Sequence, residues 1–263
     1  MNTGLYRIHP SARRVVLQMR RAALIAVVSF LAAVPAADAR GPALNGAVTK
    51  TSRVSSLRYV MDIAVLRRRY PASVLHVSGV RGPAALYVHV KSVAEVLADG
   101  TQIPGPSQSA MVDGPFLYEG APDGVAIDGT IRWLRVPLAQ GAKALDSMRN
   151  LGPTPVFHVL QESSLARART HDGTFKGAVA YDDPVVRTAL VAMTGGIEFR
   201  SLRFEATVGA DGYIHAVKMT GRTADGSKAL SVSLRLYAFG QPVRLTPPAE
   251  GTFMDHKAFI LAD

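Results

Sequence analysis

The stretch LRFEATVGADGYIHAVKMTGRTADGSKALSVSLRLY, residues 202–237, contains three runs in which apolar and polar side chains alternate. The apolar positions are Leu202, Phe204, Ala206 and Val208; Tyr213, His215, Val217 and Met219; and Leu230, Val232, Leu234 and Leu236. A period of two places alternate side chains on opposite faces of a strand. Asp211-Gly212 and Asp225-Gly226 separate the runs, and Asp-Gly pairs favour tight turns. The stretch therefore predicts an antiparallel meander with one apolar face.

Similar signals predict further strands nearer the N-terminus. Their expected ranges are 57–66, 73–77, 85–91, 114–118 and 130–136. Five more Asp-Gly pairs, which begin at Asp99, Asp113, Asp123, Asp128 and Asp172, predict turns rather than calcium ligands, because they are isolated. The run 60–66 is apolar on both faces apart from Asp62, which predicts a strand covered on both sides.

Three segments between the two strand groups have helical spacing. Their apolar positions are Leu138, Ala142, Leu145 and Met148; Val156, Phe157, Leu160 and Leu165; and Val186, Ala189, Leu190 and Met193. Thr154-Pro155 and Asp183-Pro184 are typical helix starts, and Gly195-Gly196 is a typical end. We therefore expect an α+β fold, with about three helices gathered on one face of an antiparallel sheet.

The N-terminal segment has the order of features found in secretory signal peptides. Arg20-Arg21 precedes the apolar run 22–34, and Ala37-Asp38-Ala39 supplies the small residues of a cleavage site. We expect residues 1–39 to be a signal peptide, residues 40–54 a flexible leader, and residues 55–263 a single domain. The location would then be periplasmic or secreted, with the protein soluble after cleavage near Ala39.

The charge balance narrows the classes of partner. The chain has 30 Lys+Arg and 20 Asp+Glu, and residues 1–39 remove five arginines and one aspartate, leaving 25 basic and 19 acidic residues. This excess of six, in an exported chain, argues against nucleic acid and leaves anionic lipid, glycan or envelope polymer as partners. The chain has no cysteine, which excludes a lipid anchor built on that residue.

The sequence gives little sign of catalysis or metal binding. The histidines are scattered without a His-x-x-x-His pair, and there is no Gly-x-Ser-x-Gly motif. Ser163, Ser164 and His171 are the candidates for a hydrolase, although His171-Asp172-Gly173 is also typical of a turn. We expect no enzyme activity, no cofactor and no metal. Arg67-Arg68-Arg69 is the densest basic cluster, interpreted either as a solvated hairpin end or as a contact for anionic headgroups.

Several motifs together resemble the actinobacterial LppX and LprG family of envelope lipid carriers, which belongs with the LolA-like lipoprotein carriers. They are the stretch 55–64, MVDGPFLYEG at 111–120, IDGTIRW at 127–133 and LYAFGQPVRLTPP at 236–248. The resemblance covers most of residues 55–255. It implies a strongly bent sheet, a half-barrel, with helices on its concave side and acyl chains held in an apolar cavity between them. Family members are commonly lipoproteins, whereas here Ala37-Asp38-Ala39 stands in place of the lipobox cysteine.

The resemblance makes a non-enzymatic carrier of acylated lipid or lipoprotein the leading hypothesis, acting as a monomer. Burial of a methylene contributes about 0.8 kcal/mol, so the apolar wall would dominate affinity. The candidate wall residues are Phe116, Tyr118, Trp133, Val136, Leu145, Met148, Phe157, Leu160, Leu190, Met193, Phe204, Leu234 and Leu236. Arg67, Arg68 and Arg69 are the candidates for contact with a headgroup or an anionic membrane surface.

Two other classes of protein stay open at this point. One is an exported partner-binding or sensory module whose half-barrel is filled by its own side chains. The other is a secreted hydrolase, which would need a polar cleft that holds a nucleophile and a base.

Overall fold

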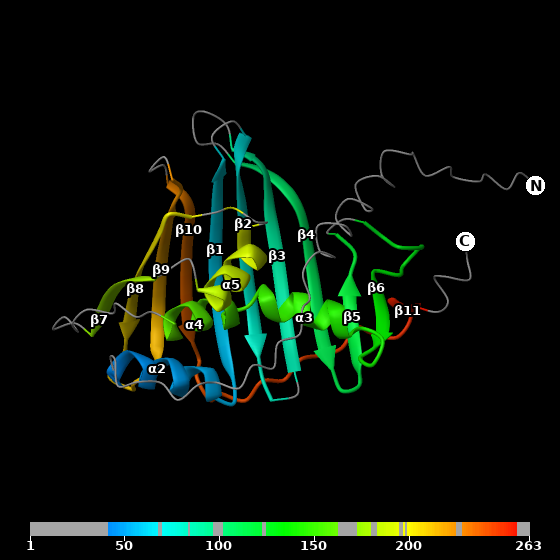
Figure 1. Ribbon diagram of the computed structural model, residues 1–263. Helices are drawn as coiled ribbons and strands as arrows, with labels where there is room; N and C mark the ends of the chain where they lie inside the picture. Colours follow the sequence, from blue (N-terminus) through cyan, green and yellow to red (C-terminus); the bar gives the residue numbers. More distant parts are fainter. Residues whose placement is uncertain are drawn as a thin grey trace, which may run out of the picture. The chain divides into compact units, whose positions relative to one another are not determined.

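Eleven strands form one open sheet in the described part of the chain (Figure 1). The computed structural model describes residues 42–67, 70–83, 85–96, 102–122, 125–162, 173–179, 183–194, 197, 199–224 and 228–256. The strands are β1 (Leu57–Arg67), β2 (Tyr70–Arg81), β3 (Ala85–Val96), β4 (Gln102–Asp113), β5 (Phe116–Gly120), β6 (Trp133–Pro137), β7 (Thr174–Val179), β8 (Ser201–Val208), β9 (Ile214–Arg222), β10 (Lys228–Tyr237) and β11 (Phe253–Asp255). Their order is β11-β6-β5-β4-β3-β2-β1-β10-β9-β8-β7, and every neighbouring pair is antiparallel except β11 with β6.

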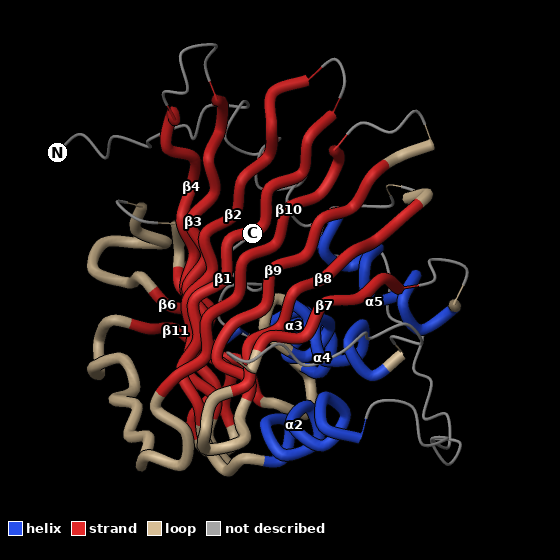
Figure 2. The backbone as a smooth tube through the Cα atoms, turned by 90° about the vertical axis from the view of Figure 1, so that its left-hand side faces the viewer, coloured by secondary structure: helices blue, strands red, loops and turns tan. Residues whose placement is uncertain are grey.

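Four helices accompany the sheet in the described residues: α2 (Pro42–Arg53), α3 (Ala142–Asn150), α4 (Thr154–Gln161) and α5 (Pro184–Thr194). Figure 2 shows the sheet from its edge, with all four helices on one side. We call that side the inner face and the opposite side the outer face. The α+β class and the gathering of helices on one face are therefore confirmed, and the described residues contain four helices where about three were expected.

The meander of β8, β9 and β10 is confirmed, with one local difference. The pairing of β8 with β9 shifts between Thr207 and Val208, where Val208 lies opposite Ile214. Because of this shift Ile214 is fully buried, whereas His215, expected on the apolar face, is partly exposed. Gly212 has a φ of 75° in the turn between the two strands, as the Asp-Gly pair predicts.

Three strands were missing from the sequence-based expectation. β4 contains the run Gly105-Pro106-Ser107-Gln108-Ser109, whose residue types have low strand propensity. β7 is short and lies between α4 and α5, so the expected order of strands, helices and strands is wrong in detail. β11 has three residues and no readable period.

The expectation that β1 is covered on both sides is also wrong. Tyr59, Met61 and Ile63 point to the inner face and are almost completely buried. On the outer face Asp62 retains 47% exposure of its side chain and accepts a hydrogen bond from His76, with Nδ1 2.6 Å from Oδ1. Among the described residues, no second layer of structure therefore covers the outer face of β1 at Asp62.

Residues 40–54 do not correspond to the flexible leader expected from composition, because 42–53 form α2. Leu44, Ala47, Val48 and Thr51 follow the helical spacing i, i+3, i+4 and i+7, and all four are buried. The helix packs against α4 and β9. This spacing was present in the sequence, but the Gly, Asn, Thr and Ser residues around it obscured the pattern.

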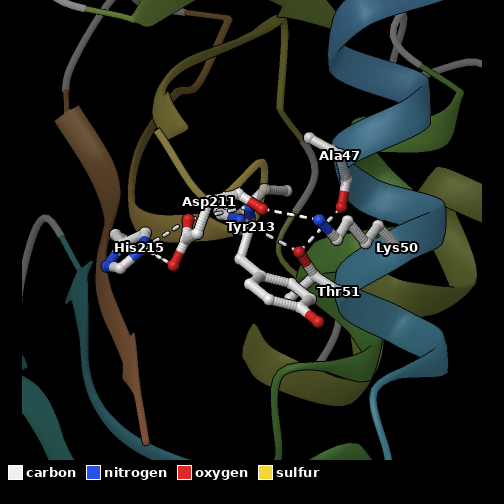
Figure 3. A network of polar contacts seen from close by, with 7 residues as sticks. Ala47, Lys50, Thr51, Asp211, Tyr213 and His215 are labelled. Carbon is white, nitrogen blue, oxygen red and sulfur yellow. Dashed lines mark hydrogen bonds and ion pairs between the residues drawn. The ribbon is translucent and has the colours of Figure 1, made fainter. Parts of the chain in front are cut away.

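Polar contacts join α2 to the turn between β8 and β9 (Figure 3). The buried Thr51 hydroxyl donates to Ala47 O at 2.7 Å and accepts from the backbone N–H of Ile214 at 2.9 Å. Lys50 Nζ donates to Asp211 O at 2.6 Å and lies 4.6 Å from the centre of the Tyr213 ring. Both contacts satisfy polar groups at the junction, so α2 is an integral part of the described structure.

The sheet edge at β11 is held by one arginine. The Arg135 guanidinium donates to both carboxylate oxygens of Asp255, at 2.7 and 3.0 Å, and lies over the rings of Phe116 and Phe253. The hydrogen bonds from Arg135 hold the pKa of Asp255 below its usual value. The C-terminal strand is therefore joined to β6 by side chains as well as by backbone pairing.

Candidate functional site

The inner face of the sheet is the most extensive apolar surface in the described residues, and its two halves differ in packing. Over β1, β8, β9 and β10 the inward side chains belong to one hydrophobic core with buried residues of α2, α4 and α5, and they have almost no exposed surface. Leu202, Leu230 and Leu234, for example, are 0% exposed. A void large enough for water would leave accessible area on its walls, so no such void touches these side chains.

Most of the predicted wall residues belong to this packed half or to its margins. Leu160, Leu190 and Leu234 are 0% exposed, and Phe157, Leu236 and Phe204 also belong to the buried core, as do Met148 and Val136. Leu145 on α3 is partly exposed and packs against the same core. These side chains lie close together, but they pack the helices against the sheet and do not line an open cavity.

Three predicted wall residues lie on the other face. Leu117 and Val136 are paired neighbours whose side chains contact the inner core, so the alternation along β5 and β6 directs Phe116, Tyr118 and Trp133 outward. Tyr118 packs edge-on against Phe116 and Phe253. The sequence pattern predicted a strand over 114–118, whereas residues 114 and 115 form a turn and β5 begins at Phe116.

The remaining predicted residues cannot be placed in the site. The backbone of Arg67 ends β1, but its side chain and that of Met193 lie outside the described part. Arg68, Arg69, Ser163, Ser164 and His171 also lie outside the described residues. Their roles stay predictions.

The inner face is less completely covered over β2, β3 and β4. Leu75, Val90 and Ala110 project from these strands, pack against the core and remain partly exposed. They are neighbours in the sheet, because Val77 pairs with Val90 and Val88 pairs with Ala110. We call these three residues the inner strip. Figure 1 shows α3 and α5 crossing in front of this part of the sheet without extending to the far ends of β2, β3 and β4.

Polar side chains border the inner strip beside all three of its residues, and Glu119 on β5 lies opposite Ala110. Ser92 lies opposite Leu75, and the exposed Gln108 lies opposite Val90. Both are nearer than Ala110 to the sheet end at which β1 finishes with Arg67. The strip thus offers apolar surface beside groups that can donate and accept hydrogen bonds. None of its three residues is among the predicted wall residues, which are mostly larger.

A buried phenol lies beneath the junction of α3 and α4. The Tyr59 hydroxyl is buried without a hydrogen-bond partner in the described residues, and burial raises its pKa above the ordinary value. Nearby, Arg81 donates to the carbonyl oxygens of Thr51 and Ser52 at 3.2 and 3.1 Å. Since carbonyls at a helix C-terminus lack partners within the helix, Arg81 caps α2.

The outer face carries a small polar cluster that the sequence did not predict. His89 Nδ1 lies 2.8 Å from Ser109 Oγ, and the Tyr87 hydroxyl lies 3.3 Å from the same oxygen. Ser109 also borders a shallow pocket of about 130 Å³ beside Trp133 and Arg132. Among the described residues no side chain orients the second ring nitrogen of His89, as a catalytic triad requires. The pocket is also smaller than the roughly 300 Å³ at which ligand pockets begin.

The described residues give no indication of a metal site or a membrane-spanning helix. They contain no group of three or more His, Asp or Glu side chains arranged to bind a metal ion. None of the helices described is both long enough and apolar enough to cross a bilayer.

Leu190→Trp tests whether the space around α5 is filled. Because Leu190 is 0% exposed, we expect the larger ring to overpack the core and lower the free energy of unfolding by about 1–3 kcal/mol. Val185→Trp on the same helix is the control, since Val185 is 45% exposed and should tolerate the change. Urea denaturation of both variants measures the effect. Equal stability of Leu190→Trp and the wild type would show that empty space exists beside α5.

The described chain is thus an α+β protein with an open, mostly antiparallel sheet and helices on one face. Solved structures show similarity to it. LprF from Mycobacterium bovis aligns over 79% of this chain and 95% of its own, with 14% identity and a TM-score of 0.43. A LolA superfamily protein from Nitrosomonas europaea aligns over 80% and 96%, with 10% identity and a TM-score of 0.27. A bifunctional dehydratase-cyclase domain of ambruticin biosynthesis aligns over 76% and 81%, with 14% identity and a TM-score of 0.19. No family model and no curated protein matches the chain.

Proposed function

We propose that the protein is a non-enzymatic carrier that holds an acyl chain of a lipid or lipoprotein against the inner strip. The observation that carries this proposal is the contrast within one face of the sheet. Leu75, Val90 and Ala110 keep exposed apolar surface, whereas the inward side chains of β8, β9 and β10 are sealed under helices. A contiguous exposed apolar surface on a folded protein favours an apolar partner.

The energetics favour a guest with a hydrocarbon chain. Each buried methylene contributes about 0.8 kcal/mol, so eight of them contribute about 6 kcal/mol before the entropy of association is counted. A surface ion pair contributes about 0–1 kcal/mol. The acyl chain would therefore supply most of the affinity, and polar groups would set its direction.

The headgroup would lie toward Ser92 and Gln108. Gln108 is exposed beside Val90 and has both an amide donor and a carbonyl acceptor for an ester or amide linkage. The end of β1 at Arg67 lies in the same direction along the sheet. This orientation keeps the expected role of Arg67, Arg68 and Arg69 near an anionic headgroup as part of the proposal.

The proposal also includes export of the protein, its location outside the cytoplasm and a bent sheet. The segment 1–39 would direct the chain out of the cytoplasm and be removed near Ala39, leaving a soluble periplasmic or secreted monomer. Bending of the sheet toward the helices, into a half-barrel, would enclose the guest between the inner strip and α3 and α5.

Native mass spectrometry of protein purified without detergent tests the proposal. A carrier is expected to show additional species whose mass excess equals that of a lipid and which disappear after extraction with organic solvent. Incubation of the extracted protein with a fluorescent C16 fatty acid should then restore one bound equivalent. An unloaded spectrum together with no fluorescent uptake would reject the carrier and favour a partner-binding module with a filled interior, to which the packed half of the inner face is suited.

A further inference from the structure

Four cations form a line across the outer face of the sheet. They are Arg58 on β1, Arg235 on β10, Lys218 on β9 and Arg203 on β8, one from each of four neighbouring strands. We call these four residues the cationic diagonal. All four side chains are exposed.

The strand pairing fixes the line. Arg235 lies opposite Val60, two residues along β1 from Arg58; Lys218 lies opposite Ser233, two residues along β10 from Arg235. Arg203 lies opposite Thr220, again two residues further along β9. Each step therefore crosses one strand and advances by two residues. With strands about 4.8 Å apart and a rise of about 3.4 Å per residue, neighbouring cations have Cα atoms about 8 Å apart and the line extends about 25 Å.

The members of the cationic diagonal make no direct ion pair within the described structure. None of its four members forms an ion pair or a side-chain hydrogen bond with another described residue. The carboxylates nearest to the line already have partners. Glu205 is paired with Lys176 at 3.1 Å and Asp62 with His76 at 2.6 Å. Glu205 also lies opposite Lys218 in the pairing of β8 with β9, so four cations stand beside two carboxylates and the line carries a net positive charge.

Small side chains, one carboxylate and one aromatic ring lie next to the line. Ser233 and Glu205 lie opposite Lys218, Ala216 lies opposite Arg235 and Thr220 lies opposite Arg203. Tyr237, which is 46% exposed, lies opposite Arg58 at one end. An exposed aromatic ring at this position offers a flat contact for a sugar or another uncharged unit between anionic groups.

We propose that the cationic diagonal binds a linear anionic polymer whose charged groups, carboxylates or phosphodiesters, repeat along an extended chain. A single file of cations on successive strands matches a linear array of charge. A bilayer surface would be matched better by a broad basic patch with large apolar side chains to insert. The residues paired with the four cations include no Leu, Ile, Met, Phe or Trp. The site lies on the face opposite the inner strip, so it is independent of lipid binding.

Fluorescence anisotropy with labelled polygalacturonate and labelled poly(glycerol phosphate) tests the proposal and distinguishes the two anionic groups. Binding of at least one polymer is expected at 50 mM salt, with no binding of neutral dextran. Four contacts predict a slope of log K against log salt of about −3, which is about 50-fold weaker binding at 200 mM salt. Absence of binding by both polymers would overturn the proposal.

Charge reversal locates the site. The double variant Arg235→Glu with Lys218→Glu is expected to weaken polymer binding at least tenfold, on the order of the loss of two such contacts. The control Arg132→Glu with Arg149→Glu changes the net charge equally at exposed positions away from the line and should bind as the wild type does. Equal loss in both variants would show a non-specific charge effect and overturn the proposal.

Vesicles separate the polymer from a membrane. Sedimentation with vesicles of phosphatidylglycerol and phosphatidylcholine should show no dependence on Arg235 and Lys218. Vesicle binding that needs these two residues, without polymer binding, would overturn the proposal in favour of an anionic membrane surface. Circular dichroism and thermal melting of each variant confirm that exposed substitutions leave the fold intact.

Discussion

Ala110→Trp is expected to lower the affinity for an acyl chain on the order of a hundredfold. The indole would lie over the inner strip and displace about four methylenes of the guest, which corresponds to about 3 kcal/mol. Ala110 is partly exposed, so the ring has surface to extend over rather than a core to enter. Titration of extracted protein with a fluorescent C16 fatty acid measures the change, and a melting curve reports stability.

Two further variants make this prediction specific. Gln108→Trp places the same ring at an exposed position beside Val90, where overpacking is not expected, and should also lower affinity. Ala64→Trp places it on the outer face of β1 and should leave affinity unchanged. Normal uptake by both Ala110→Trp and Gln108→Trp would move the acyl chain away from β3 and β4. A loss in Ala64→Trp equal to the others would indicate damage to the fold.

The sequence predicted the fold correctly where a hydrophobic period of two or of helical spacing was bounded by residues that favour turns or helix ends. Strands β8, β9 and β10 combine alternation with Asp-Gly pairs, and the three central helices combine apolar spacing with Pro or Gly boundaries. At the start of α5 the predicted cap is confirmed, since Asp183 Oδ1 accepts from the backbone N–H groups of Val185 and Val186 at 2.8 and 3.2 Å. Turns and helix caps depend on residues close together in the sequence, so they can be predicted without knowing which strands pair.

The candidate site could not be predicted in the same way, because apolar residues in a core and in a binding surface are chemically alike. Leu190 and Val90 are both apolar and lie in regular elements, yet one is 0% exposed and the other partly exposed. The difference depends on how far α3 and α5 extend over the sheet, which is a property of tertiary packing. Which face a side chain occupies is hard to predict for a related reason. Phe116 and Tyr118 alternate with Leu117, and only the pairing of Leu117 with Val136 shows that Leu117 is the residue that faces the helices.

Gly79→Ala is expected to lower the free energy of unfolding by about 1–3 kcal/mol, because the Tyr59 ring occupies the space of the missing side chain. A Cβ at position 79 would lie 2.6 Å from Tyr59 Cε1 and still closer to Cζ and to the hydroxyl oxygen. The two residues face each other across β1 and β2, and the ring is 1% exposed, so it has no free space into which to move. Urea denaturation measures the loss.

A double-mutant cycle with Tyr59→Leu separates this contact from a general cost of alanine in a strand. Tyr59→Leu removes the ring, so Gly79→Ala in that background should cost much less, with a coupling energy of about 0.5–3 kcal/mol. Tyr59→Phe should be neutral or stabilising, since it deletes a buried hydroxyl that lacks a partner among the described residues. Gly46→Ala in α2 is the matched control: nothing lies within 4 Å of its added Cβ, and a gain of about 0.5–1 kcal/mol is expected in a helix. If the two losses are additive, the Tyr59 ring and Gly79 do not interact. Contact with Tyr59 would then not be the reason for glycine at position 79.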